Sequence, residues 1–253
     1  MLKRVLIDMN RSKLVDSDIP LFESLVEDLF RQYLITPVDH GNLKPLIKQM
    51  TDKLGIFAHK PREPGVENKW HISCEQLYET SLVRHGIMIL GPTMAGKSST
   101  IYTLAKVLPE MSPEKKRLTV LKMNPKAITA PQMFGILNAQ TGDWTDGIFS
   151  ALWRRTCKKE GEFYWIVLNG PVDAVWIENL NTVLDDNKTL TLANSDRIPM
   201  SKTLKLVFEV DSLDNASPAT VSRAGMIYMS GFSAYGWTLL FYAWIKEWPA
   251  EVK

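Results

Sequence analysis

The spacing of apolar residues along the chain changes near residue 85. Before that point, apolar residues recur every three or four positions, which is typical of helices, and no strand pattern occurs. Helices are predicted after Pro20, over residues 46–54 and over residues 72–84. Breaks between the first two are expected at Pro37, Gly41 and Pro45. The first part of the chain is therefore predicted to be all helical.

From residue 85 onward, short apolar runs alternate with helical patterns. The runs predicted as strands are residues 87–90, 118–123, 163–168, 204–210 and 226–229. Because strands that alternate with helices form parallel sheets, we expect an α/β fold with a five-stranded parallel sheet covered by helices.

Two further elements are predicted between the third and fourth strands. Residues 176–184 have helical spacing, and Asp173 is placed to cap that helix. A hairpin is predicted over residues 190–198, with its turn at Asn194-Ser195. Another segment, residues 131–147, is too rich in turn residues for a plain helix.

Composition narrows the class of protein. The chain has 253 residues, of which 45% are hydrophobic, and 30 basic residues nearly balance 28 acidic ones. This balance does not indicate a nucleic acid partner or an anionic membrane, and no apolar run approaches the ~20 residues of a membrane span. Cys74 and Cys157 form no disulfide or zinc pattern, and the four histidines have no metal spacing. We expect a soluble protein of the cytoplasm that is not secreted.

The most informative stretch lies between the first predicted strand and a helical pattern that begins at Thr100. It reads Gly91-Pro92-Thr93-Met94-Ala95-Gly96-Lys97-Ser98-Ser99 and fits the phosphate-binding pattern G-x-x-x-x-G-K-[ST]. Its glycines let the backbone turn its N–H groups toward phosphates. Lys97 would neutralise the β- and γ-phosphates, and the Ser98 hydroxyl would bind Mg²⁺. All nine residues are candidate contacts for ATP or ADP.

The groups that hydrolysis needs are missing after the third strand. ATPases of this architecture place there an Asp for Mg²⁺ and a Glu that polarises water, but this chain has Asn169 followed by Gly170. Asn169 can still hold a metal-bound water, whereas Gly170 offers no base. Glu209, at the end of the fourth strand, is left open as a contact on the phosphate side, while Asp173 and Glu178 are read as a helix cap and a solvated residue. We expect ATP to be hydrolysed very slowly or not at all.

A short helix near the end of the sheet region presents Arg223. Ser217 is its predicted cap, Pro218 its first residue and Gly225 its terminator. An arginine on such a platform has the layout of an arginine finger offered to a neighbouring subunit, and the alternative is a surface arginine in a weak ion pair.

These motifs together resemble the second AAA+ module of a dynein heavy chain, and their sequences are most similar to those of axonemal heavy chains of the outer-arm type. The resemblance covers nearly all of residues 85–230. The segments that carry it are residues 91–99, 123–128, 143–147, 165–173, 176–179, 183–188 and 217–225. Residues 5–14 resemble the helical lid of the preceding, first module.

The resemblance implies a P-loop AAA+ large subdomain preceded by a small helical lid subdomain. The expected domains are residues 1–60 (lid of the preceding module), 61–84 (connecting segment and leading helix, with a loop at residues 60–65), 85–232 (large subdomain) and 233–253 (start of a truncated region that lacks the module's own lid). Asn169 and Ile7 depart from the family, which usually has Asp and a phosphate-sensing Arg at those positions.

For function, the resemblance implies a module that binds ATP, with Mg²⁺, without turning it over. Its arginine finger, Arg223, would complete the site of the first module, which performs the force-linked hydrolysis. The segments 131–147 and 190–198 resemble loops that touch the linker. The expected partners are neighbouring AAA+ modules, the linker, intermediate and light chains and microtubules, with no nucleic acid or membrane, in the cytoskeleton of a ciliary or flagellar axoneme.

Other classes remain as alternatives. A self-contained P-loop ATPase or small kinase would need a carboxylate after the third strand and its own lid. A third alternative is a purely structural module whose pocket no longer binds nucleotide. The presence of Lys97 and Ser98 argues against it. A GTPase is disfavoured because no Asn-Lys-x-Asp motif occurs.

Overall fold

The computed structural model describes residues 3, 6–7, 10–15, 17–33, 40–54, 69–112, 114, 116–158, 161–230, 244–245 and 248. The chain divides into two compact units. One comprises Met1–Glu79, Gly91–Met111 and Met226–Lys253, and the other Thr80–Leu90 and Ser112–Gly225. The predicted loop at residues 60–65, the break at Pro37 and nearly all of residues 233–253 lie outside the described residues.

The helices of the first part agree with the apolar spacing. The elements are η1 (Arg11–Lys13), α2 (Ile19–Leu29), α3 (Leu43–Lys53), α4 (Lys69–Val83) and α5 (Lys97–Met111). The break expected at Pro45 is wrong, because α3 begins at Leu43 and Pro45 lies in its first turn, where a missing N–H costs no hydrogen bond. Similarly, α5 begins at Lys97 rather than at Thr100. In the first unit, α3 packs against α5.

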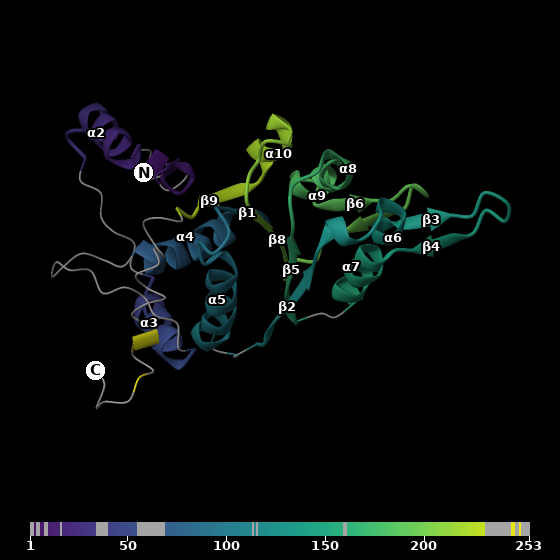
Figure 1. The fold of residues 1–253 in the computed structure, drawn as a ribbon, viewed down its shortest axis with the longest axis horizontal. Coiled ribbons are helices and arrows are strands. Elements are labelled where there is room, and N and C mark those ends of the chain that lie inside the picture. Colours follow the sequence, from purple (N-terminus) through teal and green to yellow (C-terminus); the bar gives the residue numbers. More distant parts are fainter. Residues whose placement is uncertain are drawn as a thin grey trace. The chain divides into compact units, whose positions relative to one another are not determined.

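The predicted parallel sheet is present. Its strands are β1 (Gly86–Leu90), β2 (Leu118–Met123), β5 (Phe163–Asn169), β8 (Leu204–Val210) and β9 (Gly225–Tyr228), in the order β2-β5-β8-β1-β9 (Figure 1). The pairings of β2 with β5, β5 with β8 and β8 with β1 are parallel. Asn169 lies opposite Glu209, and Leu90 lies opposite Val210, so β1, β5 and β8 end at one edge of the sheet.

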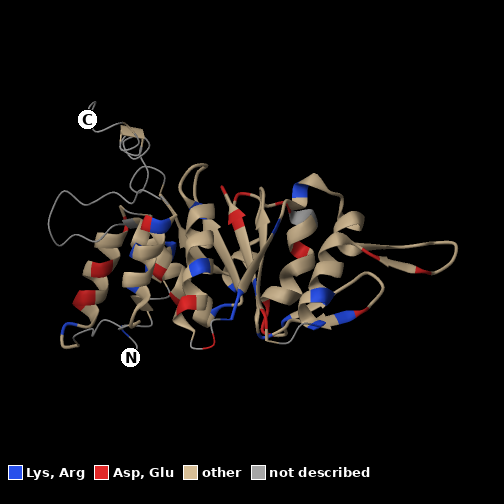
Figure 2. Cartoon of the chain, turned by 90° about the horizontal axis from the view of Figure 1, so that it is seen from below, with Lys and Arg blue, Asp and Glu red and all other residues tan. Residues whose placement is uncertain are grey.

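Charged residues lie mainly on helices and loops, and the strands of the sheet carry few of them (Figure 2). The charged positions within the five strands are Lys122, Lys205 and Glu209. Lys205 Nζ donates to Ser81 O at 2.6 Å and to Arg84 O at 3.0 Å, and so neutralises the end of α4. Burial lowers the pKa of this lysine, with a smaller contribution from Lys188.

The helix predicted over residues 176–184 is divided. It consists of α8 (Ala174–Ile177), η3 (Glu178–Leu180) and α9 (Asn181–Leu184). Apolar spacing cannot separate α- from 3₁₀-turns over so few residues, because both place residues three or four apart on one face. The apolar residues of this segment nevertheless pack on the sheet: Trp176 stacks on Phe208 of β8, and Leu184 packs over Gly86 so closely that a side chain there would clash.

Two hairpins extend from the second unit (Figure 1). The predicted one is confirmed: β6 (Thr189–Thr191) pairs antiparallel with β7 (Arg197–Pro199), and Ser195 has a φ of 67° in the turn. Segment 131–147 forms most of α6 (Ala130–Phe134) and a second hairpin of β3 (Gly135–Leu137) and β4 (Trp144–Asp146). The hairpin is followed by α7 (Ile148–Lys158), a helix that was not predicted. Smaller elements are η2 (Pro125–Ala127) and α10 (Pro218–Arg223).

Among the residues with described structure, no helix combines the length and hydropathy that a membrane span requires.

Candidate functional site

The loop between β1 and α5 has the backbone geometry that its glycines predict. Met94 and Gly96 have φ angles of 67° and 86°, in the left-handed region. Alternating backbone handedness turns successive N–H groups toward one concavity. Gly91 packs against Met229 so closely that a Cβ at this position would overlap the Met229 carbonyl. The loop is therefore shaped by its sequence and closed on one side by a backbone contact.

Lys97 lies inside this loop. Its side chain belongs to a residue that is only 7% exposed, and Nζ donates to Gly91 O at 2.6 Å and to Pro92 O at 3.0 Å. A buried ammonium needs acceptors, and the loop carbonyls supply them. Phosphate oxygens are stronger acceptors of the same kind, so the position of Lys97 suits a bound phosphate chain.

The first turn of α5 adds hydrogen-bond donors. Thr100 N donates to Gly96 O at 2.9 Å and thereby closes the first helical hydrogen bond. The N–H groups before it, at the start of a 15-residue helix, have no intrahelical acceptor and carry the positive end of the helix dipole. Loop, lysine and helix start together form a chemically suitable anion site within the first unit.

At the ends of β5 and β8, in the second unit, three polar side chains meet. Asn169 Nδ2 donates to Glu209 Oε2 at 3.0 Å, and Lys122 Nζ lies 3.0 Å from the same oxygen. Glu209 is 7% exposed. The carboxylate whose role the sequence left open is therefore held between an amide and a cation. Lys122 was missed, although a lysine within an apolar strand run was a visible signal.

Gly170 occupies a confined position after Asn169. Its N–H donates to Glu209 O at 3.2 Å, and a Cβ at this position would lie 2.7 Å from Asn124 Oδ1. Asn124 Oδ1 also accepts from Lys126 N at 2.9 Å. The residue where a general base is needed thus lacks a side chain, and its surroundings are closed around a glycine.

The other carboxylates considered from the sequence lie elsewhere in the second unit. Asp173 precedes α8, and its backbone carbonyl accepts from Trp176 N and Ile177 N; capping by its side chain stays a prediction. Glu178 is exposed, as expected. Among the described residues, no group of three or more His, Cys, Asp and Glu side chains is arranged to hold a metal ion.

Arg223 ends α10 as the sequence predicts. Ser217 caps the helix by accepting from Thr220 N at 3.2 Å. The Arg223 side chain is 33% exposed, and its Nε donates to Asp185 Oδ1 in an ion pair. Asp185, the residue that follows α9, was not singled out from the sequence because 38 positions separate it from Arg223.

Gly225 does not terminate α10 in the predicted way. Ala224 is the C-cap residue with an extended backbone, and Gly225 already begins β9. Glycine is needed there for packing, because a Cβ would clash with Thr80 and approach Arg84. The expectation of a terminating glycine is therefore wrong.

The structure thus groups the candidate residues in three places. Lys97 contacts the backbone of Gly91 and Pro92, in the first unit. Asn169 and Glu209 meet with Lys122, and Arg223 meets Asp185, both in the second unit. A glycine-rich phosphate loop that follows a strand of a parallel sheet and opens a helix defines the P-loop class of nucleotide-binding domains.

Comparison with known proteins identifies the family. Residues 86–224 match the family described as "AAA domain (dynein-related subfamily)", and residues 1–98 match "Hydrolytic ATP binding site of dynein motor region". The chain therefore belongs to the dynein-related subfamily of AAA domains, and it is an ATP-binding AAA region of the dynein motor type.

Relatives agree with this assignment. The chain is 53% identical over 245 residues to dynein axonemal heavy chain 5 of Rattus norvegicus, covering 96% of this chain and 7% of that protein. It is 54% identical over 245 residues to dynein axonemal heavy chain 8 of Mus musculus, covering 96% and 5%. To the dynein gamma chain, flagellar outer arm, of Chlamydomonas reinhardtii it is 50% identical over 247 residues, covering 98% and 5%. The resemblance to axonemal, outer-arm heavy chains is thereby confirmed, and the chain spans only 5–7% of the length of these relatives.

Proposed function

We propose that this chain supplies an axonemal dynein heavy chain with a module that binds ATP and does not hydrolyse it. The observation that carries this proposal is the end of β5, where Asn169 is followed by a glycine closed in by Asn124. A positioned general base contributes roughly 10²–10⁴ in rate, and no side chain at this position can provide one.

The binding half of the proposal is supported by the loop. Lys97, the loop N–H groups and the start of α5 would hold the phosphates of ATP or ADP, and the Ser98 hydroxyl would bind Mg²⁺. Asn169, taken by itself in the second unit, would hold a metal-bound water through its amide. Bound Mg²⁺ supplies charge neutralisation between the phosphates. Asn169 contributes no negative charge to a cation, so its support for Mg²⁺ is weaker than that of an aspartate.

Glu209 is not assigned as a substitute base. Its Oε2 accepts from the Asn169 amide and pairs with the Lys122 ammonium, and these two contacts hold the side chain in place. Its role is to orient the Asn169 amide, whose carbonyl oxygen is then at the opposite end of the amide group from Glu209.

The module is assigned the second place in the motor. Two family models meet in the chain, one named for the hydrolytic site at residues 1–98 and an AAA domain at residues 86–224. The start of the second match supports a large subdomain that begins near residue 85. We propose with it a lid of the preceding module (residues 1–60), a connecting segment (61–84), the large subdomain (85–232) and a further region (233–253).

Arg223 is assigned as an arginine finger for the preceding, catalytic module. It ends a capped helix and is one-third exposed, and the ion pair with Asp185 fixes its direction. The hairpins β3–β4 and β6–β7 are assigned to contact the linker of the same heavy chain. Through the complete motor, the expected partners are intermediate and light chains and microtubules in the axoneme.

The proposal is tested by separating binding from turnover. ATP is titrated calorimetrically into the 253-residue chain with Mg²⁺, and phosphate release is followed in a single-turnover experiment with enzyme in excess. We expect heat of binding without phosphate release above the no-protein control. Steady turnover that Glu209→Gln abolishes would show a competent enzyme instead, and absent binding in both this chain and a heavy chain extended through the following lid would leave only a scaffold.

A further inference from the structure

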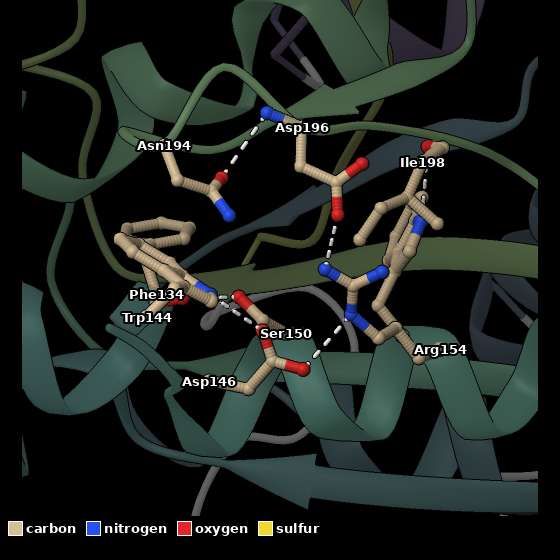
Figure 3. Close-up of polar contacts among 9 residues, drawn as sticks. Phe134, Trp144, Asp146, Ser150, Arg154, Asn194, Asp196 and Ile198 are labelled. Carbon is tan, nitrogen blue, oxygen red and sulfur yellow. Dashed lines mark hydrogen bonds and ion pairs between the residues drawn. The ribbon is translucent and has the colours of Figure 1, made fainter. Parts of the chain in front are cut away.

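One arginine of α7 is bound to two hairpins that come from different parts of the sequence. Arg154 Nε donates to Asp146 Oδ2 at 2.8 Å, and its Nη2 pairs with Asp196 Oδ2 (Figure 3). Asp146 is the last residue of β4, whereas Asp196 immediately precedes β7. Two nitrogens of a single guanidinium thus connect the β3–β4 hairpin with the β6–β7 hairpin.

Both aspartates are held within their own hairpins, Asp146 by its carboxylate and Asp196 by its backbone. Asp146 Oδ1 accepts from Trp144 Nε1 at 2.8 Å, and the Trp144 ring packs against Gly135 on the paired strand. The backbone N–H of Asp196 donates to Asn194 Oδ1 at 3.1 Å in the turn. Because the Asp146 carboxylate and the Asp196 backbone are each bonded within their own hairpin, the common partner Arg154 links the two hairpins and not only two side chains.

Two other residues of α7 each contact only one of the two hairpins or the residue next to it. Trp153 Nε1 donates to Ile198 O of β7 at 3.4 Å, and Ser150 Oγ donates to Phe134 O, just before β3, at 2.5 Å. Both residues are fully buried, and Figure 3 shows Ser150 beside Phe134. Arg154, in contrast, is 32% exposed and contacts both hairpins, Asp146 at the base of β3–β4 and Asp196 beside the β6–β7 turn. Ion pairs that water partly reaches add little to folding stability, so the main effect of Arg154 is on geometry.

We propose that Arg154 fixes the mutual orientation of the two hairpins, so that they meet a partner as one two-pronged element. A planar guanidinium with donors in a rigid fork sets the angle between two carboxylates, which a lysine cannot do. Two arms ordered before contact also avoid the cost of ordering them on binding. The choice of the linker as partner rests on the proposed function. The link that Arg154 makes between the two hairpins, called the Arg154 clamp, does not.

The orientation is measured in the 253-residue chain by pulsed electron paramagnetic resonance. Spin labels are attached at Gln140→Cys, in the β3–β4 loop, and at Ala193→Cys, in the β6–β7 turn; both positions are exposed. The background carries Cys157→Ser, and Cys74 is fully buried. The distance distribution between the labels reports the two hairpins directly.

We expect a narrow distribution with Arg154 present and about a twofold broader one in Arg154→Met, since the two facing carboxylates then repel each other. Arg154→Lys should give an intermediate width. The matched control is Arg155→Met, which removes the neighbouring exposed arginine of the same helix and should leave the width unchanged. Thermal unfolding of each variant confirms folding, and Asp196→Asn, which weakens one arm only, should broaden the distribution even if Arg154→Met does not fold. Equal widths in the parent and in the folded Arg154 and Asp196 variants would overturn the proposal.

A second readout separates the clamp from the partner. In a longer heavy chain that includes the linker, Arg154→Met should weaken the contact between hairpins and linker, measured by cross-linking yield, about threefold to tenfold. A broadened distribution without any change in cross-linking would retain the clamp and exclude the linker as the partner of the paired hairpins. Reduced cross-linking with an unchanged distribution would overturn the clamp and leave the proposed linker contact standing.

Discussion

The phosphate loop and the end of β5 have opposite relations to nucleotide chemistry. Residues 91–98 have the features that we propose for phosphate binding: left-handed turns at Met94 and Gly96, a buried lysine and a helix start. At the end of β5, Asn169 is hydrogen-bonded to Glu209 of the neighbouring strand. An amide and a glycine stand there in place of two carboxylates.

The difference teaches that binding and hydrolysis depend on different physical requirements. Binding depends on many hydrogen-bond donors and on one positive charge. Most of the donors are backbone N–H groups that local conformation sets. Hydrolysis adds one proton acceptor that must occupy a single position near the attacking water. A module can therefore lose turnover through one residue while its affinity persists.

The largest expected effect concerns the neighbouring module. In a heavy chain that includes the preceding module, Arg223→Ala should lower the steady-state ATPase rate by about 10³-fold or more, because an arginine finger stabilises the transition-state charge. Nucleotide affinity of the loop at residues 91–98 should stay unchanged. The control is Arg117→Ala, an exposed arginine before β2. Equal rates for the two variants would show that Arg223 is an ordinary surface residue.

Next in size is the loss of the loop lysine. Lys97→Ala removes charge-assisted hydrogen bonds worth about 1.5–3 kcal/mol each, so the ATP dissociation constant should rise roughly a hundredfold. Calorimetry measures this, and Lys106→Ala on the exposed face of α5 provides the matched control. An unchanged affinity would mean that ATP binds elsewhere or without its phosphates in the loop.

A smaller effect should appear as a gain. Gly170→Glu introduces a carboxylate where a base is needed, and single-turnover hydrolysis should rise by about tenfold, below the full 10²–10⁴ because Asn124 must move. Adding Asn124→Ala relieves the overlap with Asn124 Oδ1 and should raise the rate further. The control is Gly170→Gln, which introduces a side chain of the same size as glutamate that cannot act as a base. If this variant hydrolyses ATP as fast as Gly170→Glu, the missing base is not what limits turnover.

The smallest effect concerns the metal. Because Asn169 offers an amide oxygen and no charge, removing Mg²⁺ with EDTA should change ATP affinity by less than about tenfold. Asn169→Asp should increase this Mg²⁺ dependence, measured by titrations at matched ionic strength. A strong metal requirement in the unaltered chain would show that Asn169 supports the cation as well as a carboxylate does.

The sequence by itself determined the features that depend on neighbouring residues. Apolar spacing located the five strands and most helices to within a few residues, the glycine-lysine pattern located the phosphate loop, and Ser217 located the start of α10. The absence of a side chain at Gly170 was also visible directly. Such features follow from local conformational preferences and short-range hydrogen bonds, which a short window of sequence contains.

Only the tertiary structure decided the long-range pairs. Glu209 meets Asn169 across 40 positions because the parallel register aligns the ends of β5 and β8. In the same way, Asp185 holds Arg223, Arg154 joins two hairpins, and Gly225 proved to be a packing residue rather than a helix terminator. Each of these contacts depends on the closure of a long loop and on the register of distant strands, and nothing in the residues near either partner encodes them.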